Sequence, residues 1–178
     1  MYLGARLSGF GGQGVVSAGV LLAYAGMLDN KNVSFFPAYG AEMRGGTANC
    51  SVVVSDEQVA SPVVTAPDVA IVFNEPSFAK FEPLVKKGGV LIINTSLVNS
   101  KSTRKDIKII EVPLNQMADK LGNSKVLNMI ALGALSKVTN AVSKESLSEA
   151  IPKVYKKLKP ELIELNRKAV LEGYNYIN

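Results

Sequence analysis

The chain has 178 residues, of which 47% are hydrophobic, and its formal net charge at neutral pH is +5. This length predicts one domain, residues 1–178, with a substantial core. One cysteine and no histidine exclude a disulfide framework and an iron–sulfur cluster ligated by this chain alone. They also remove the commonest catalytic base and metal ligand, so we expect no catalytic residue and no metal site in the chain.

The distribution of charged and apolar residues narrows the possible partners. Basic residues are interspersed with acidic ones, unlike the basic strip of a nucleic-acid reader, so we expect no nucleic-acid partner. Uninterrupted apolar runs stay below 18 residues, and the N-terminus lacks the features of a signal peptide, which predicts a cytoplasmic protein with no membrane contact. The high apolar fraction predicts that part of the surface faces a partner and that the lone chain self-associates, for example as a homodimer.

A glycine-rich turn follows the first predicted strand, residues 2–7, and leads without a linker into an apolar helix over residues 14–28. The turn reads Ser-Gly-Phe-Gly-Gly-Gln-Gly over residues 8–14, and its four glycines allow positive φ and a close approach of the backbone to a ligand. A strand, glycine turn and helix in this order present free N–H groups and a helix dipole to an anion. We interpret the turn as a phosphate cradle. The alternative is a tight turn that only lets the helix and strand pack closely.

The same turn matches G-x-G-x-x-G at Gly9, Gly11 and Gly14, which is a weak signal by itself. The full dinucleotide fingerprint requires an acidic residue about 20 positions later, at the end of the second strand. The second predicted strand, residues 33–36, ends in Pro-Ala-Tyr-Gly, and Asp29 lies before the strand. The missing carboxylate argues against NAD or FAD bound in the Rossmann manner.

A second glycine-rich loop covers residues 37–46 and shows no regular period. Arg44, followed by Gly45 and Gly46, would offer a planar fork of donors to a phosphate beside an accessible backbone. A surface loop in which Arg44 pairs with Glu42 is the alternative.

The next predicted strand, residues 47–55, contains Cys50, which we interpret as a small buried hydrophobe, with a redox or nucleophilic role as the alternative. A proline-bounded extended segment over residues 61–67 would suit the edge of the sheet. Strands over residues 69–73, 90–93 and 107–112 then alternate with helices, one of which begins near Pro76 and ends at Gly88 and Gly89.

Four asparagines stand out in this half of the chain. Asn74 and Asn94 follow strands, at the edge where open α/β sheets bind ligands, and are candidates for ligand contact or for turn caps. Asn123 and Asn128 lie in apolar surroundings, and each either ties down a loop or faces a ligand.

Helices are expected over residues 114–121 and 126–138, from a cap at Ser143, and from Pro160 to about residue 172, with Gly173 as the stop. The alternation of strands and helices predicts a three-layer α/β/α domain around a largely parallel, Rossmann-like sheet.

The order and spacing of four short motifs give the chain a family resemblance. They are Gly-Phe-Gly-Gly-Gln-Gly over residues 9–14, Tyr-Gly-Ala-Glu-Met-Arg-Gly-Gly over 39–46, Asn-Glu-Pro-Ser over 74–77 and Asn-Met-Ile-Ala-Leu-Gly over 128–133. Together they resemble the gamma subunit of the 2-oxoacid:ferredoxin oxidoreductases over essentially the whole chain. Ala41 stands where many relatives would carry proline. Within that family, the chain resembles the 2-oxoglutarate or 2-oxoisovalerate type more than the pyruvate type.

The resemblance implies part of a multisubunit enzyme that oxidatively decarboxylates a 2-oxoacid, forms acyl-coenzyme A and passes electrons to ferredoxin or a similar acceptor. It implies thiamine diphosphate on alpha and beta subunits and iron–sulfur clusters on other chains, including an iron–sulfur subunit. This chain would complete the assembly and help to bind coenzyme A, and by itself it would be inactive. The cofactor-binding residues implied are Gly9, Gly11, Gly12, Gln13, Gly14, Tyr39, Glu42, Arg44, Gly45 and Gly46.

Two other functions compete with this interpretation. The first is a free-standing, Rossmann-like oxidoreductase that binds NAD or FAD through the glycine turn. The second is a purely structural subunit, in which the glycines make tight turns and Arg44 contacts protein.

Overall fold

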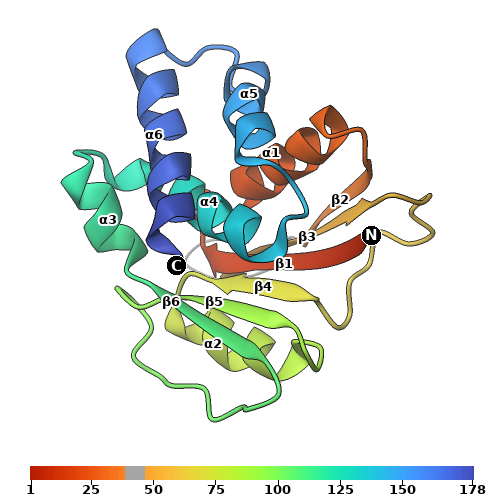
Figure 1. Ribbon diagram of the computed structural model, residues 1–178. Coiled ribbons are helices and arrows are strands. Elements are labelled where there is room, and N and C mark those ends of the chain that lie inside the picture. The colour runs from red at the N-terminus through yellow and green to blue at the C-terminus, as the bar shows by residue number, and fades with distance from the viewer. Residues whose placement is uncertain (39–46) are drawn as a thin grey trace.

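A computed structural model of the protein describes residues 1–38 and 47–178. Within these residues, six strands form one sheet in the order β2-β3-β1-β4-β5-β6 (Figure 1). The neighbours β1–β4, β4–β5 and β5–β6 are parallel, whereas β3 is antiparallel to both β1 and β2. The predicted, largely parallel α/β sheet is therefore confirmed. The strands are β1 Tyr2–Phe10, β2 Asn32–Ala38, β3 Thr47–Ser55, β4 Val69–Val72, β5 Val90–Asn94 and β6 Lys108–Val112.

Helices cover both faces of the sheet and complete three layers (Figure 1). One face is covered by α1 (Val15–Leu28) and α4 (Leu127–Thr139), against which α5 (Lys144–Val154) and α6 (Pro160–Tyr176) pack in turn, and α3 (Leu114–Lys120) packs beside α4. The other face carries α2 (Glu75–Phe81), which continues into a short 3-10 helix, Glu82–Leu84. A second 3-10 turn, Ser124–Val126, precedes α4. None of the described helices is long and apolar enough to cross a membrane.

Side-chain alternation along the strands builds two apolar cores. On β1, Leu3, Ala5 and Leu7 point toward the layer of α1 and α4, because successive side chains of a strand point to opposite faces. Cys50 of β3 is fully buried in the same core, and burial raises the pKa of its thiol to about 12. The interpretation of Cys50 as a small buried hydrophobe is confirmed, since a thiol with this pKa stays protonated near neutral pH.

The last helix does not stop at Gly173, as the sequence predicts, but continues to Tyr176. The reason is a close crossing of α6 and α4: a Cβ atom at Gly173 would overlap the carbonyl oxygen of Ile130, and one at Gly133 would overlap that of Val170. Glycine is needed here because two backbones touch, and this close contact outweighs its weak helix propensity.

Other boundaries also differ from the prediction. The first strand extends to Phe10, because β3 pairs with it as far as Thr47. The segment 61–67 forms no strand, and its Val64 instead packs against Gly4 of β1. The helix that begins at Glu75 ends well before Gly88, since Pro83 follows within the 3-10 turn.

Candidate functional site

The glycine turn lies between the end of β1 at Phe10 and the start of α1 at Val15, at the carboxyl edge of the parallel strands. Gly12 has φ +93° and Gly14 has φ +72°, both in the left-handed region that favours glycine. Gly14 is the N-cap of α1, and no side chain caps the helix there. Among the described residues, the N–H groups of Gly11, Gly12 and Gly14 find no acceptor. The turn therefore presents free backbone donors at the positive end of a helix dipole.

A Cβ atom at Gly12 would meet no protein atom within 4 Å. It would project into open space in front of the turn. Glycine at this position is therefore favoured by the backbone conformation and not by a close contact with other protein atoms.

Gln13 is used to hold the turn in shape. Its Oε1 accepts a hydrogen bond from the N–H of Phe10 at 2.6 Å, and its own N–H donates to the carbonyl of Phe10 at 3.2 Å. Its Nε2 lies 3.5 Å from the carbonyl oxygen of Phe73, at the end of β4. Both the N–H and the side chain of Gln13 are thus engaged within the chain, so a contact between Gln13 and a ligand remains a prediction.

The other two glycines of the motif allow close packing around the turn. A Cβ at Gly9 would lie 2.8 Å from the Cβ of Phe73, and one at Gly14 would lie 2.5 Å from Nδ2 of Asn128. That Nδ2 donates to the carbonyl of Gly14 at 3.1 Å. Asn128, at the start of α4, therefore ties down the turn, which was one of its two predicted roles.

Asn94 and Asn74, the two asparagines that follow strands, differ in how many of their side-chain hydrogen-bonding groups have a partner. The amide of Asn94 donates to the carbonyl of Phe73 at 3.1 Å and to Oδ1 of Asn115 at 2.8 Å, and its Oδ1 accepts from the N–H of Leu114 at 3.1 Å. Oδ1 of Asn74 caps α2 through the N–H of Ser77 at 2.9 Å, while its buried Nδ2 has no partner among the described residues. The side chain of Asn94 therefore links the ends of β4 and β5 to the start of α3, and the side chain of Asn74 keeps one N–H donor group without a partner among the described residues.

Arg6 is a polar residue that the sequence analysis did not single out. It lies on the α2 face of β1, where it donates to Oδ1 of Asn49 at 2.9 Å and to the carbonyl of Val64, and stacks 5.3 Å from the ring centre of Phe81. Burial lowers the pKa of its guanidinium. The signal in the sequence was a charged residue at an alternating position within an otherwise apolar strand.

Two cavities flank the glycine turn. The first, which we call the helical cavity, has a volume of about 380 Å³ and lies between the turn, the start of α4 and the first turns of α6. The second, the strand cavity, measures about 390 Å³ and lies between the turn and the strand ends at Ala38 and Ala48. Gly12, Gly14 and Ser17 line both cavities, so the turn forms the ridge between them.

Five of the predicted cofactor-binding residues lie outside the described residues. They are Tyr39, Glu42, Arg44, Gly45 and Gly46. The segment that contains them joins Ala38 to the start of β3, and both flanks of this segment reach the glycine turn, because Ala38 and Ala48 line the strand cavity with Gly11 and Gly12. The residues that flank the second glycine-rich segment, Ala38 and Ala48, therefore lie beside the glycine turn.

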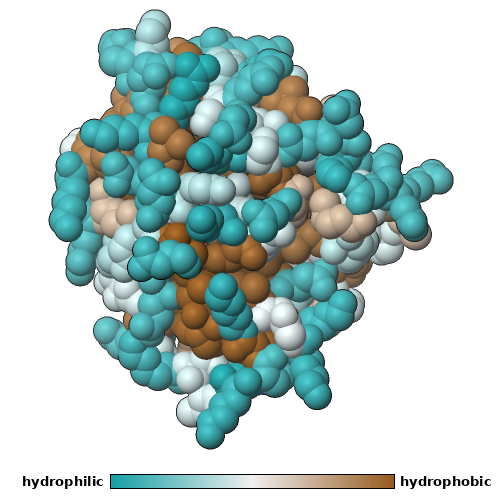
Figure 2. Space-filling model, viewed as in Figure 1, coloured by the Kyte–Doolittle hydropathy of each residue, from teal (hydrophilic) through white to brown (hydrophobic). Residues whose placement is uncertain are grey.

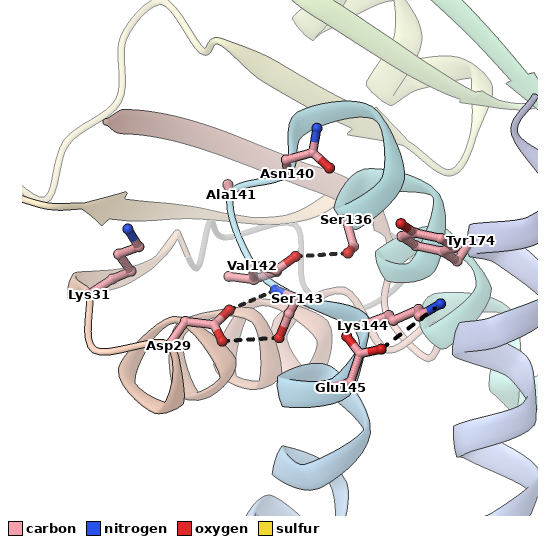
Figure 3. Close-up of a pocket in the computed structure, with 10 residues that line it drawn as sticks. All are labelled: Asp29, Lys31, Ser136, Asn140, Ala141, Val142, Ser143, Lys144, Glu145 and Tyr174. Carbon is pink, nitrogen blue, oxygen red and sulfur yellow. Dashed lines mark hydrogen bonds and ion pairs between the residues drawn. The ribbon is translucent and has the colours of Figure 1, made fainter.

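A third cavity, of about 420 Å³, lies at the other end of α1, about 20 Å from the turn at 1.5 Å per residue (Figure 3). Asp29 points into the start of α5, where it accepts hydrogen bonds from the N–H and the hydroxyl of Ser143 at 2.6 and 3.0 Å. The hydroxyl of Ser136 donates to the carbonyl of Val142 at 2.8 Å. Since these polar groups satisfy one another, we interpret this cavity as part of the packing between α1, α4 and α5. In residues 1–38 and 47–178, no group of three or more acidic, cysteine or histidine side chains could hold a metal ion.

Comparison with known proteins identifies the family. Residues 4–176 match the family described as pyruvate ferredoxin/flavodoxin oxidoreductase. The chain belongs to this family. The family resemblance seen in the four sequence motifs is confirmed.

Three relatives of this family illustrate the similarity. The ketoisovalerate oxidoreductase subunit VorA of Methanothermobacter marburgensis is 36% identical over 172 residues, covering 96% of this chain and 36% of VorA. The gamma subunit of a keto/oxoacid ferredoxin oxidoreductase from Geobacter sulfurreducens has a TM-score of 0.84 and 31% identity, covering 98% of this chain and 95% of that subunit. A 2-oxoglutarate:ferredoxin oxidoreductase from Magnetococcus marinus, solved with 2-oxoglutarate, coenzyme A and succinyl-CoA bound, has a TM-score of 0.88 and 26% identity, covering 99% of this chain and 32% of that chain.

The coverage differs among these relatives. This chain spans about a third of VorA and of the Magnetococcus chain, and nearly all of the Geobacter gamma subunit. It therefore matches a gamma-type unit that occurs both as a separate subunit and inside longer chains.

Proposed function

We propose that this chain is the gamma component of a multisubunit 2-oxoacid:ferredoxin oxidoreductase, and that its glycine turn binds the diphosphate of coenzyme A. In the overall reaction, a 2-oxoacid, coenzyme A and two oxidised ferredoxins give an acyl-CoA, CO₂, two reduced ferredoxins and a proton. The observation that carries the proposal is the glycine turn itself: left-handed glycines, free N–H groups and an uncapped α1. A structural relative that was solved with coenzyme A bound supports the choice of ligand.

The chemistry of the turn fits a diphosphate. Backbone N–H groups at a helix N-terminus stabilise a negatively charged oxygen through hydrogen bonds and the helix dipole, and they need no side chain to do so. A ligand held in this way requires no acidic residue for its ribose at the end of β2. Arg44, from the second glycine-rich segment, would add a positive charge on the side of the strand cavity.

The redox chemistry would be supplied by other polypeptides. We assign thiamine diphosphate to alpha and beta subunits and iron–sulfur clusters to an iron–sulfur subunit, with ferredoxin or a similar protein as acceptor. The single cysteine supports this division, because Cys50 is buried and protonated and does not fit a cluster ligand. A cytoplasmic location forms part of the proposal.

The surface supports a role within an assembly. Figure 2 shows apolar residues gathered near the middle of one face, surrounded by hydrophilic ones. Contiguous apolar surface rimmed by polar residues is typical of protein interfaces. We propose that partner subunits cover part of it, and that the isolated chain uses it to form homodimers.

For the substrate, we favour 2-oxoglutarate or a branched-chain 2-oxoacid over pyruvate. The names of VorA and of the Magnetococcus enzyme support this preference. Titration of each 2-oxoacid into the reconstituted complex tests it, and activity confined to pyruvate would overturn it.

The test of the phosphate cradle is calorimetric titration of coenzyme A into the assembled complex, made with the wild-type chain, Gly12→Ala and Arg44→Ala. We expect each variant to weaken binding at least about tenfold, which corresponds to about 1.4 kcal/mol. If both variants assemble poorly and yet bind coenzyme A like the wild type, the chain has a structural role alone.

A further inference from the structure

Three helices meet at the mouth of the third cavity, at the end of α1 that lies away from the glycine turn. Lys144 is the first residue of α5 and Tyr174 lies in the last turn of α6, and both side chains line this mouth (Figure 3). Lys137 lies in the last turn of α4. Since α4, α5 and α6 pack against one another, their ends hold these three side chains on a firm support.

Two ammonium groups lie against one aromatic ring. Nζ of Lys137 is 5.1 Å and Nζ of Lys144 is 4.6 Å from the ring centre of Tyr174, so the two ammonium groups lie within about 10 Å of each other. The electron-rich face of the ring attracts each cation, but the ring carries no net charge. The two positive charges therefore remain uncompensated by the ring.

These two lysines also lack a close carboxylate. Every other lysine of the chain is exposed except Lys31, which pairs with Asp56. Lys137 makes no ion pair with any residue in 1–38 or 47–178. Lys144 reaches only Glu145, at 3.9 Å, and that side chain is 73% exposed, so the pair contributes little. Two half-buried cations thus lie side by side without a strong counter-charge from the described part of the chain.

Apolar surface adjoins the two cations. Leu171, which is 41% exposed, lies one turn before Tyr174 on the same side of α6. One turn earlier, Nε of Arg167 donates to the carbonyl of Ser148 at 3.3 Å, which places this side of α6 along α5. A small anion would make no use of the exposed leucine, whereas a protein partner would cover it together with the tyrosine ring.

We infer that Lys137, Lys144, Leu171 and Tyr174, which we call the lysine–tyrosine patch, dock an acidic segment of another subunit of the complex. Two carboxylates one helical turn apart, about 5–6 Å between their Cβ atoms, can pair with both ammonium groups at once. The patch and the glycine turn lie at opposite ends of α1, so a docked subunit leaves the turn open. This inference rests on the proposed function, because it requires that the chain is part of an assembly.

The first part of the test reverses the two charges. The chain carrying Lys137→Glu and Lys144→Glu is titrated calorimetrically into the complex of the other subunits, and we expect at least about tenfold weaker association than for the wild type in about 50 mM salt. The control carries Lys156→Glu and Lys157→Glu, the same change in net charge at two exposed lysines beyond the other end of α5. It should associate like the wild type. Equal weakening by the two pairs, or no weakening by the first pair, overturns the inference.

The second part removes the charges without introducing carboxylates, so that it does not depend on the reversed chain being folded. In about 50 mM salt, the chain carrying Lys137→Gln and Lys144→Gln should also associate more weakly than the wild type. Because salt screens ion pairs, raising the concentration to about 500 mM should weaken the wild type and bring the two affinities together. A difference that survives high salt would show that the lysines do not act through ion pairs, and the inference would be wrong.

The inference and the proposed function fail in different ways. If the wild-type chain does not associate with the other subunits, both are wrong. If it associates and both lysine variants associate equally well, the chain is part of the assembly and the docking role of the patch is refuted. If the variants lose only self-association in sedimentation, the patch binds a second copy of this chain, and the inference is wrong as well.

Discussion

Replacement of Gly12 by alanine separates a ligand-binding role of the glycine turn from a structural one. The residue has φ +93°, and a Cβ atom there would point into open space. An L-residue in the left-handed region costs about 1–2 kcal/mol, so the free energy of unfolding of the chain should fall by about that amount. The new methyl group would also stand where the phosphate oxygens approach the N–H groups.

Gly88 provides a matched control. It has φ +79°, and a Cβ atom there also meets nothing within 4 Å, but the residue lies between α2 and β5, away from the glycine turn. Gly88→Ala should therefore destabilise the chain by a similar amount, about 1–2 kcal/mol, without touching the candidate site.

The assay combines denaturant unfolding of the full chain with calorimetric titration of coenzyme A into the assembled complex. We expect similar losses of stability in the two variants, together with at least about tenfold weaker binding in Gly12→Ala alone. Equal affinity for coenzyme A in the two variants would refute the reasoning, because strain alone would then explain every effect of Gly12→Ala.

Three further substitutions or treatments test the fold. Gly173→Ala should cost about 1–3 kcal/mol in denaturant unfolding, because its methyl group overlaps the carbonyl of Ile130, and a stability equal to the wild type would contradict that close crossing. Cys50 should not react with a thiol reagent at pH 8 in the folded chain, since its thiol is buried with a pKa of about 12, and rapid labelling would show an exposed thiolate. Hydrogen bonds from Lys31 and from the terminal ammonium lower the pKa of Asp56 to about 2. The carboxyl of Asp56 therefore has a lower pKa in the folded chain than the ordinary value of about 3.9 that applies to the unfolded chain. The contribution of this pKa difference to the free energy of unfolding is present above pH 4 and is lost as the pH falls toward 2. In an acid titration, the free energy of unfolding of Asp56→Asn should therefore lack this pH-dependent contribution. An acid sensitivity equal to that of the wild type would contradict the role of Asp56.

The order of strands and helices could be predicted from the sequence alone, because apolar periodicity and glycine or proline boundaries are local properties of the chain. The same holds for the glycine turn: left-handed backbone at Gly12 and Gly14 follows from residue types within one short segment. The family could also be predicted, since the order of short motifs needs no coordinates.

Contacts between distant segments were decided by the tertiary structure. Asn128 and Gly14 lie 114 positions apart, and the sequence left open whether this asparagine binds a ligand or a loop until their hydrogen bond was seen. Gly173 follows the ordinary pattern of a helix stop, yet it continues α6 because α4 touches it.

The lining of the helical cavity also could not be predicted from the sequence. Ser17, Lys125 and Asn166 come from three separate helical segments, and no local pattern in the sequence marks any of them as part of one site. Propensity and spacing describe neighbours along the chain, whereas the walls of a cavity are set by how α1, α4 and α6 pack around the end of the sheet.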